Sequence, residues 1–186
     1  MEYEGFHGTN RDFEELILIG NFNVSADSDE WLGTGAYFFI DGISDPKEDA
    51  KNWAKLQAYD SDIGKNTYHR FSVVSAKINV SQVLRLDTDE GMKAFNEYRD
   101  RLIDLMKRNG IRPKKSMIES DCEICNHIFS QSGFEAIINN EFIQLDLWSR
   151  RTRYRSRMPV CKIMSVKDPS TSVDINDIAV VQRGRV

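Results

Sequence analysis

The chain has 186 residues, of which 40% are hydrophobic and 29% charged, and its formal net charge at pH 7 is −4. This composition predicts one soluble domain spanning residues 1–186, with a core large enough to fold unaided. No run approaches the roughly 18 apolar residues of a membrane span, and residues 1–6 lack a basic stretch followed by an apolar one. We therefore expect a cytoplasmic protein with no membrane partner, although delivery by a dedicated export machine would leave the same pattern.

The first half of the chain predicts strands that alternate with two helices. Gly20 ends the first helix, and Pro46 suits the first turn of the second. β-branched residues favour strands after residue 67. The predicted elements are a strand over 3–8, a helix over 12–19, a loop over 21–30, a strand over 36–40, a helix over 48–59, a turn over 60–66, and strands over 68–78 and 80–86.

The second half predicts two more helices and then strands. A helix over 91–109 has one apolar face and ends at Gly110, and a helix over 120–129 is expected to turn its apolar side to the core. A strand follows over 134–138. The dipeptide Asn139-Asn140 favours a turn, so residues 141–147 either extend that strand or begin another. With final strands over 160–166 and 175–181, the fold class is α+β.

Two glycine-containing segments carry the residues that suggest chemistry. His7, Gly8 and Thr9 end the first predicted strand, where they offer an imidazole, an unshielded backbone and a hydroxyl to a flat polar ligand. The second segment, 32–39, places two glycines just before an aromatic strand, and so directs Tyr37 at a neighbouring surface. One segment therefore supplies hydrogen bonds and the other supplies a ring for stacking.

Three stretches, GFHGTN at 5–10, WLGTGAYFFID at 31–41 and DAKNWA at 49–54, resemble the NAD-binding half of ADP-ribosyltransferases of the diphtheria-toxin and poly(ADP-ribose) polymerase type. The signature of that group is a His, a Tyr and usually a Glu on three separate strands. The resemblance gives His7 the first place and Tyr37 the second, as in a small bacterial toxin-like member. It implies an ADP-ribosyltransferase-like fold, with two small antiparallel sheets around an NAD cleft and flanking helices.

The resemblance also makes NAD the co-substrate and assigns five residues to it. Tyr37 and Trp53 would sandwich the nicotinamide ring, the Gly8 backbone would bind its carboxamide, and His7 and Thr9 would contact ribose hydroxyls. Without the resemblance, the two aromatic residues are ordinary core residues and His7 is a buried imidazole with its hydrogen bonds satisfied. Both interpretations are open at the level of the sequence.

The third catalytic position needs a negative charge, because cleavage of the nicotinamide–ribose bond builds positive charge on the ribose. The segment NEFI at 140–143 is similar to the glutamate motif of poly(ADP-ribose) polymerases, so the resemblance makes Glu141 the catalytic carboxylate. If the corresponding strand were 160–166 instead, that position would hold no carboxylate, and Gln144 would be a weaker candidate. A surface glutamate at the start of a strand is the alternative interpretation of Glu141.

The expected activity is transfer of a single ADP-ribose from NAD to a macromolecular acceptor, either a nucleic acid, such as RNA, or a protein. Such an enzyme would act as a toxin, an effector or an antiviral defence protein, and an antitoxin or other inhibitor protein would be a natural partner. An NAD glycohydrolase, which transfers ADP-ribose to water, is the second enzyme hypothesis. A domain that binds NAD or RNA without turnover is the third.

An arginine-rich segment over 150–157 is the most basic part of this acidic chain. Its charges and its one aromatic ring could contact phosphates and stack on a base of the acceptor. A solvated loop or an edge strand guarded by charge is the alternative. The candidate acceptor-binding residues are Arg150, Arg151, Arg153, Tyr154 and Arg155.

The three cysteines are too few for a secreted disulfide framework. Cys122, Cys125 and His127 have the spacing of half a zinc site, with Cys161 as a fourth ligand, but no second pair completes it. We therefore expect reduced, buried cysteines and no metal.

Overall fold

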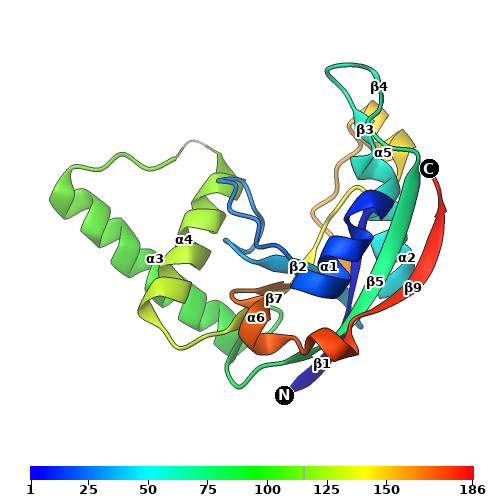
Figure 1. The fold of residues 1–186 in the computed structure, drawn as a ribbon. Coiled ribbons are helices and arrows are strands. Elements are labelled where there is room, and N and C mark those ends of the chain that lie inside the picture. Colours follow the sequence, from blue (N-terminus) through cyan, green and yellow to red (C-terminus); the bar gives the residue numbers. More distant parts are fainter. Residues whose placement is uncertain (115) are drawn as a thin grey trace.

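Seven strands form one mixed sheet, and two short strands form a separate ribbon, in the computed structural model, which describes residues 1–114 and 116–186 (Figure 1). The strands are β1 (Glu2–Asn10), β2 (Ala36–Ile40), β3 (Tyr59–Asp60), β4 (Lys65–Asn66), β5 (Arg70–Asn79), β6 (Val83–Arg85), β7 (Ala136–Glu141), β8 (Cys161–Val166) and β9 (Ala179–Arg185). The α-helices are α1 (Glu14–Gly20), α2 (Pro46–Gln57), α3 (Asp89–Asn109), α4 (Met117–Gln131), α5 (Leu147–Thr152) and α6 (Pro169–Ser172). Short 3-10 turns, η1 (Arg11–Phe13) and η2 (Ile175–Asp177), precede α1 and β9.

The α+β class is confirmed, but the sheets differ from the two small antiparallel sheets expected. The large sheet has the order β6-β7-β8-β2-β1-β5-β9, and only β3 and β4 stand apart from it. It is continuous because β1 pairs with both β2 and β5. It is mixed because β6 and β7 are parallel, and the α3–α4 crossover between them supplies the long connection that a parallel pair needs.

The sheet is buried on both faces. Consecutive residues of one strand belong to different clusters of core side chains: Ile137 and Ile163 join one cluster, and Ile138 and Met164 join the other. α2 and α4 contribute to the first cluster and α1 to the second. Burial on both faces explains why the central strands β2 and β8 are mainly apolar.

Local sequence signals begin and end the main helices. Asp45 caps α2 by accepting hydrogen bonds from the backbone amides of Lys47 and Glu48. Thr88 caps α3 in the same way, and Gly110 ends it in a left-handed conformation at φ 65°. These signals are the reason that the predicted helix positions are close to the observed ones.

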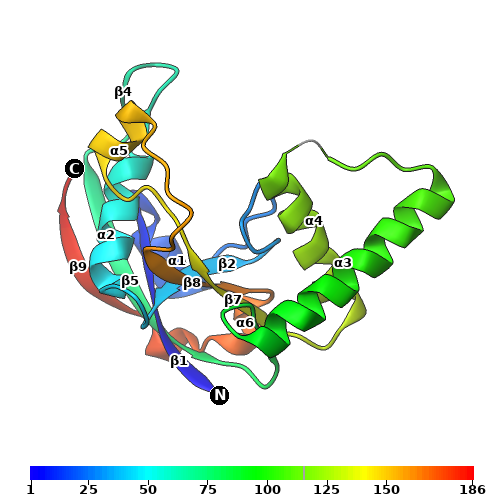
Figure 2. The same cartoon turned by 180° about the vertical axis from the view of Figure 1, so that it is seen from behind.

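α3 and α4 pack on each other and extend to one side of the sheet, opposite α2 and α5 (Figures 1 and 2). The apolar face expected for α3 is only partly covered, since Met106 is buried while Ile103 and Leu105 are exposed. The buried side of α4 was predicted correctly. Within the described ranges, no helix is long and apolar enough to cross a membrane.

The turn expected at Asn139-Asn140 does not form. Both residues lie inside β7, where they pair with Ile163 and Lys162 of β8, and Glu141 is the last residue of the strand. Pairing with β8 outweighs the turn preference of the asparagines. Glu141 therefore sits at a strand end, and the segment that follows it leads into α5, which was not predicted.

Candidate active site

The site begins where β1 and β2 separate. β1 pairs with β5 over its whole length but with β2 only at Gly5 and Phe6. Beyond these residues the edges of the two strands part, and a cavity of about 160 Å³ opens between them. His7, Gly8, Tyr37 and Trp53 all line this space, which we call the ring cavity. It has several times the ~30 Å³ of one liquid water, so it suits one small flat group.

Four of the five residues assigned to NAD thus meet in one place. Thr9 is the exception: it follows Gly8 on β1, but it is not among the described residues that line the ring cavity. Gly8 has a structural reason to be glycine: a Cβ built there would lie 1.8 Å from the Ala50 carbonyl oxygen of α2. This close approach sets α2 directly against β1 and positions Trp53, which lies further along the same helix.

Both hydrogen bonds of the Tyr37 hydroxyl are made with the glycine-containing loop before β2. It donates a 2.6 Å hydrogen bond to the Gly33 carbonyl and accepts a 2.8 Å bond from the Leu32 amide. Gly33 itself adopts a left-handed conformation at φ 78°. The hydroxyl therefore shapes the loop, and the ring is the part of Tyr37 that can meet a ligand. Burial raises the pKa of this hydroxyl, which keeps it protonated.

His7 is held as a neutral imidazole. Its Nδ1 lies 2.9 Å from the Tyr37 carbonyl oxygen, and because that oxygen only accepts, Nδ1 carries the proton. Burial lowers the pKa of the ring, against the smaller opposing effect of this hydrogen bond. Phe22 and Phe38 contact it edge to face. Nε2 is left with its lone pair and can accept a hydrogen bond from a hydroxyl, the role that the resemblance implies.

Trp31 and Glu30 complete the ring cavity and were not assigned a role from the sequence. The rings of Trp31 and Trp53 lie edge to face, with centroids 5.4 Å apart. Burial raises the pKa of the Glu30 carboxyl, which accepts a hydrogen bond from Ser25. Trp31 is the first residue of the stretch WLGTGAYFFID, and this position in the motif is the sequence signal that could have identified it as a site residue. Nothing local in the sequence distinguishes Glu30 from the neighbouring acidic loop residues.

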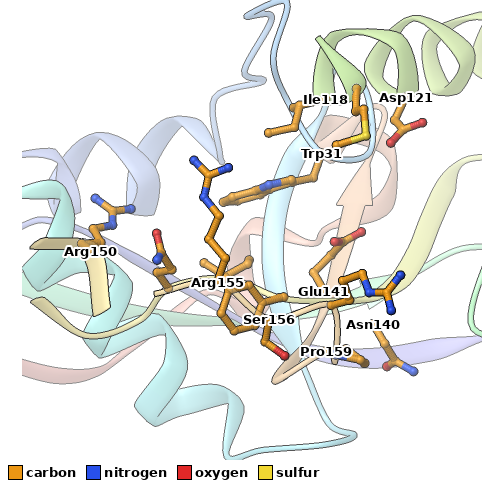
Figure 3. A pocket seen from close by; sticks show the side chains of 14 residues that line it. Trp31, Ile118, Asp121, Asn140, Glu141, Arg150, Arg155, Ser156 and Pro159 are labelled. Atoms are coloured by element: carbon orange, nitrogen blue, oxygen red, sulfur yellow. The ribbon is translucent and has the colours of Figure 1, made fainter. Parts of the chain in front are cut away.

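A second cavity of about 570 Å³ contains Glu141, and we call it the glutamate cavity. Trp31 and Ile143 line both cavities, so the two adjoin. Glu141 and Asp121 lie toward one end and Arg150 toward the other (Figure 3). Together the cavities reach the size range of sites for small organic ligands and cofactors.

The Glu141 carboxyl is half-buried, and burial raises its pKa. The nearby charge of Asp121 acts in the same direction, while a 2.7 Å hydrogen bond from the Asn139 amide favours the ionised form. Glu141 thus lies in the cleft rather than on an open surface. Its carboxylate is oriented by a side chain two residues earlier on the same strand.

Gln144, the weaker candidate for the catalytic position, lines the glutamate cavity and also holds the chain around α5. Its amide donates hydrogen bonds to the carbonyl oxygens of Ser149, at 3.1 Å, and Tyr154. These bonds tie the segment containing α5 to the chain just after Glu141. The segment 160–166, the other candidate for the catalytic strand, forms β8 beside β7.

The candidate acceptor residues form a third concave surface of about 520 Å³, the arginine groove. Arg150, Arg151, Arg153 and Arg155 line it, whereas Tyr154 lies beside it and does not belong to its lining. Arg150 and Arg155 also line the glutamate cavity. The arginine-rich segment is therefore an exposed surface that continues into the cavity of Glu141.

The cysteines are free and buried in the core, as expected. Cys122 lies near the Asp27 carbonyl, and Cys161 pairs with Glu141 across the β7–β8 ladder. Across residues 1–114 and 116–186, no three His, Cys, Asp or Glu side chains are grouped in a way that could hold a metal ion.

Comparison with known proteins adds no further identification. No protein-family model matches the chain, and no match is found among curated proteins or solved structures.

Proposed function

We propose that the protein is a mono-ADP-ribosyltransferase that uses NAD as co-substrate and modifies a macromolecule. The observation that carries the proposal is the joint lining of one small cavity by His7, Gly8, Tyr37 and Trp53, next to a larger cavity that contains Glu141. These residues come from three strands and one helix, far apart in the chain. An ordinary core would bring the aromatic residues together, but it would not add an oriented, half-buried carboxylate beside them.

The nicotinamide ring would occupy the ring cavity. Tyr37 and Trp53 supply aromatic faces, each contributing about 0.5–1.5 kcal/mol beyond simple burial. The Gly8 backbone borders this cavity, where it would bind the carboxamide, and His7 offers Nε2 to a ribose hydroxyl. Holding the leaving group and the ribose in one orientation reduces the entropic part of the barrier.

Glu141 would act on the ribose. As the C1–nitrogen bond to nicotinamide lengthens, positive charge develops on C1 and the ring oxygen, and its electron pair passes to the nicotinamide. An ionised Glu141 in the adjoining glutamate cavity would stabilise that charge and could hold the ribose 2′-hydroxyl. The acceptor then attacks C1 from the side of the glutamate cavity and loses a proton to solvent.

Isotope-labelled NAD incubated with purified protein and a cell lysate, then separated into protein, RNA, DNA and small-molecule fractions, tests this proposal. We expect label in one macromolecular fraction and a loss of about two decades in rate for Glu141→Gln with NAD affinity retained. Glu90→Gln is the matched control, because it makes the same carboxylate-to-amide change at an exposed residue in the first turn of α3. It should keep the rate within several-fold.

Other distributions of label lead to other functions. Label recovered only as free ADP-ribose would establish an NAD glycohydrolase. NAD that is bound but never cleaved would establish a binding domain without turnover. A normal rate in Glu141→Gln, with a large loss in Glu30→Gln, would transfer the catalytic role to Glu30.

A further inference from the structure

The arginine-rich segment carries charge that the chain does not neutralise. Within the described ranges, none of the five arginines at 150–157 has a carboxylate within ion-pair distance. Several arginines elsewhere do pair with carboxylates: Arg70, Arg85, Arg99, Arg101 and Arg183. A cluster of like charges without internal partners concentrates positive potential and attracts an anionic partner.

Aromatic rings are exposed among these cations. Trp148 is 67% exposed and Tyr154 57%, and their ring centroids lie 6.4 Å apart at a tilt of 41°. Tyr59, at the edge of the arginine groove, lies under the Arg151 guanidinium, 5.8 Å from it. Flat apolar rings beside positive charges suit bases and phosphates together. An acidic peptide would satisfy the arginines and leave the rings exposed to water.

The arginine groove continues toward the catalytic carboxylate. Gln144, Arg150 and Arg155 line both the groove and the glutamate cavity. Asp121 and Glu141 lie at the end of that cavity away from Arg150 (Figure 3), and a third arginine, Arg157, lines the cavity as well. Apolar side chains line it as well: Trp31, Met117, Ile118, Phe142 and Ile143. These apolar side chains suit a flat group such as an aromatic base.

We propose that the acceptor is a single-stranded nucleic acid whose phosphates lie along Arg151, Arg153 and Arg155 while one unpaired base enters the glutamate cavity. This inference rests on the proposed transferase function. A ring or exocyclic nitrogen of that base forms the new bond to C1 of the ribose. The bond from C1 to nicotinamide breaks with its electrons on nicotinamide, and the base nitrogen releases its proton to solvent.

The strand must be single or locally opened for geometric reasons. A base inside a duplex is stacked and paired, and cannot reach an enclosed carboxylate without being extruded. Stacking on Trp148 and Tyr154 likewise needs bases that are free on at least one face. Double-stranded nucleic acid could meet the arginines only with its backbone.

Binding is measured first, without NAD, by fluorescence anisotropy of labelled ~20-nucleotide oligomers as single-stranded RNA, single-stranded DNA and a DNA duplex. The groove variant is Arg151→Ser with Arg153→Ser, and its matched control is Arg108→Ser with Arg112→Ser, two exposed positions near the end of α3. We expect the groove variant to bind a single strand at least tenfold more weakly at about 0.1 M salt. Its log–log salt slope should be smaller in magnitude by about 1.4, the value for two lost phosphate contacts. The control should stay within twofold.

A ring variant tests the stacking separately. Trp148→Ala should weaken single-strand binding about fivefold or more and leave the salt slope unchanged. Circular dichroism of each variant verifies that it is folded. Labelled NAD is then added, and the oligomers are analysed for label; the RNA and DNA arms identify which nucleic acid is modified.

The outcomes separate this inference from the proposed function. Glu141-dependent NAD cleavage with no oligomer binding, or with label only on protein, would overturn the nucleic-acid acceptor and leave the transferase intact. Oligomer binding without NAD cleavage would overturn the transferase and the acceptor role with it. Equal affinity for single strands and duplex would overturn the single-stranded requirement.

Discussion

The guanidinium carbon of Arg150 lies 5.5 Å from the centre of the Trp53 ring. This contact joins the wall of the ring cavity to the arginine groove. Arg150 is half-buried, burial lowers its pKa, and no carboxylate in the described ranges pairs with it. A desolvated cation held by an aromatic face alone is costly, which is typical of a group that serves a ligand rather than the fold.

Replacement of Arg150 by leucine should therefore separate stability from binding. We expect Arg150→Leu to melt at the same temperature or higher, because a desolvated unpaired charge is removed. Because Arg150 lines the glutamate cavity beside Trp53, we expect it to contact the NAD diphosphate as well. NAD should then bind about tenfold more weakly, which corresponds to about 1.4 kcal/mol. Thermal melting and calorimetric titration measure the two effects. If the NAD affinity were unchanged, Arg150 would not contact NAD, and binding of the acceptor would be its remaining proposed role.

The Tyr37 hydroxyl and the Tyr37 ring should have separable effects. Tyr37→Phe leaves the Leu32 amide without its partner, and we expect the free energy of unfolding to fall by about 1–3 kcal/mol. The ring remains, so NAD affinity should change less than threefold below the melting transition. Chemical denaturation and titration test this. A large affinity loss at full stability would assign the hydroxyl to the ligand instead.

Gly8 should tolerate no side chain. In Gly8→Ala the new Cβ would meet the Ala50 carbonyl oxygen at 1.8 Å, which forces β1 and α2 apart. We expect a loss of about 3 kcal/mol or more, or an insoluble protein. Gly20→Ala is the matched control, since nothing lies within 4 Å of its Cβ position, and it should be neutral or slightly stabilising. Equal stabilities would contradict the close packing of α2 on β1.

The rate should depend on pH through Glu141. Its pKa is raised by burial and the catalytic form is ionised, so activity should rise with pH along a limb placed above the ordinary value of 4.5 and then level off. Asn139→Ala removes a hydrogen bond to the carboxylate and should move the limb to higher pH. Asp121→Asn removes a nearby negative charge and should move it to lower pH. Shifts of the same sign in both variants would argue against Glu141 as the titrating group.

Glu14, which lines none of the three cavities described above, should control acid stability. Hydrogen bonds from Arg183, followed by one from Ser72, lower the pKa of Glu14 to about 2. Because this value lies below the unfolded value of 4.5, its contribution is full above pH 4.5 and is lost as the pH falls toward 2. Glu14→Gln should lower the unfolding free energy at pH 7 by about 1 kcal/mol and flatten this acid limb. Urea unfolding at several pH values measures both.

The sequence predicted α1 to α4 and most strands because their signals are local. Asp45, Thr88 and Gly110 act within one helical turn, and the aromatic and β-branched runs at 36–40 and 68–78 determine strands by their own composition. Strand partners are not local information. The single mixed sheet depends on β1 pairing on both edges, and the internal position of Asn139 depends on β8, which lies further along the chain.

The residues of the candidate site likewise fall into two groups, those that local motifs indicate and those that tertiary packing brings to the site. His7, Gly8, Tyr37 and Trp53 were found because they belong to short motifs in a fixed order. Glu30 and Asp121 reach the cavities through a loop and a helix whose placement depends on tertiary packing, so no spacing in the sequence indicates them. The hydrogen bonds of Gln144 to Ser149 and Tyr154, which hold the segment containing α5, depend on tertiary structure in the same way and could not be predicted from its position in the sequence.

The contact between Gly8 and Ala50 has a consequence for ligand selection. Because strand and helix touch through backbone atoms there, the distance from Gly8 to Trp53 cannot widen without breaking the packing of α2 on β1. The ring cavity therefore has a fixed width between Gly8 and Trp53 when no ligand is bound. A cavity of fixed width selects ligands by their thickness and shape. We therefore expect a flat benzamide to bind more tightly than a bulky or puckered ring of the same polarity.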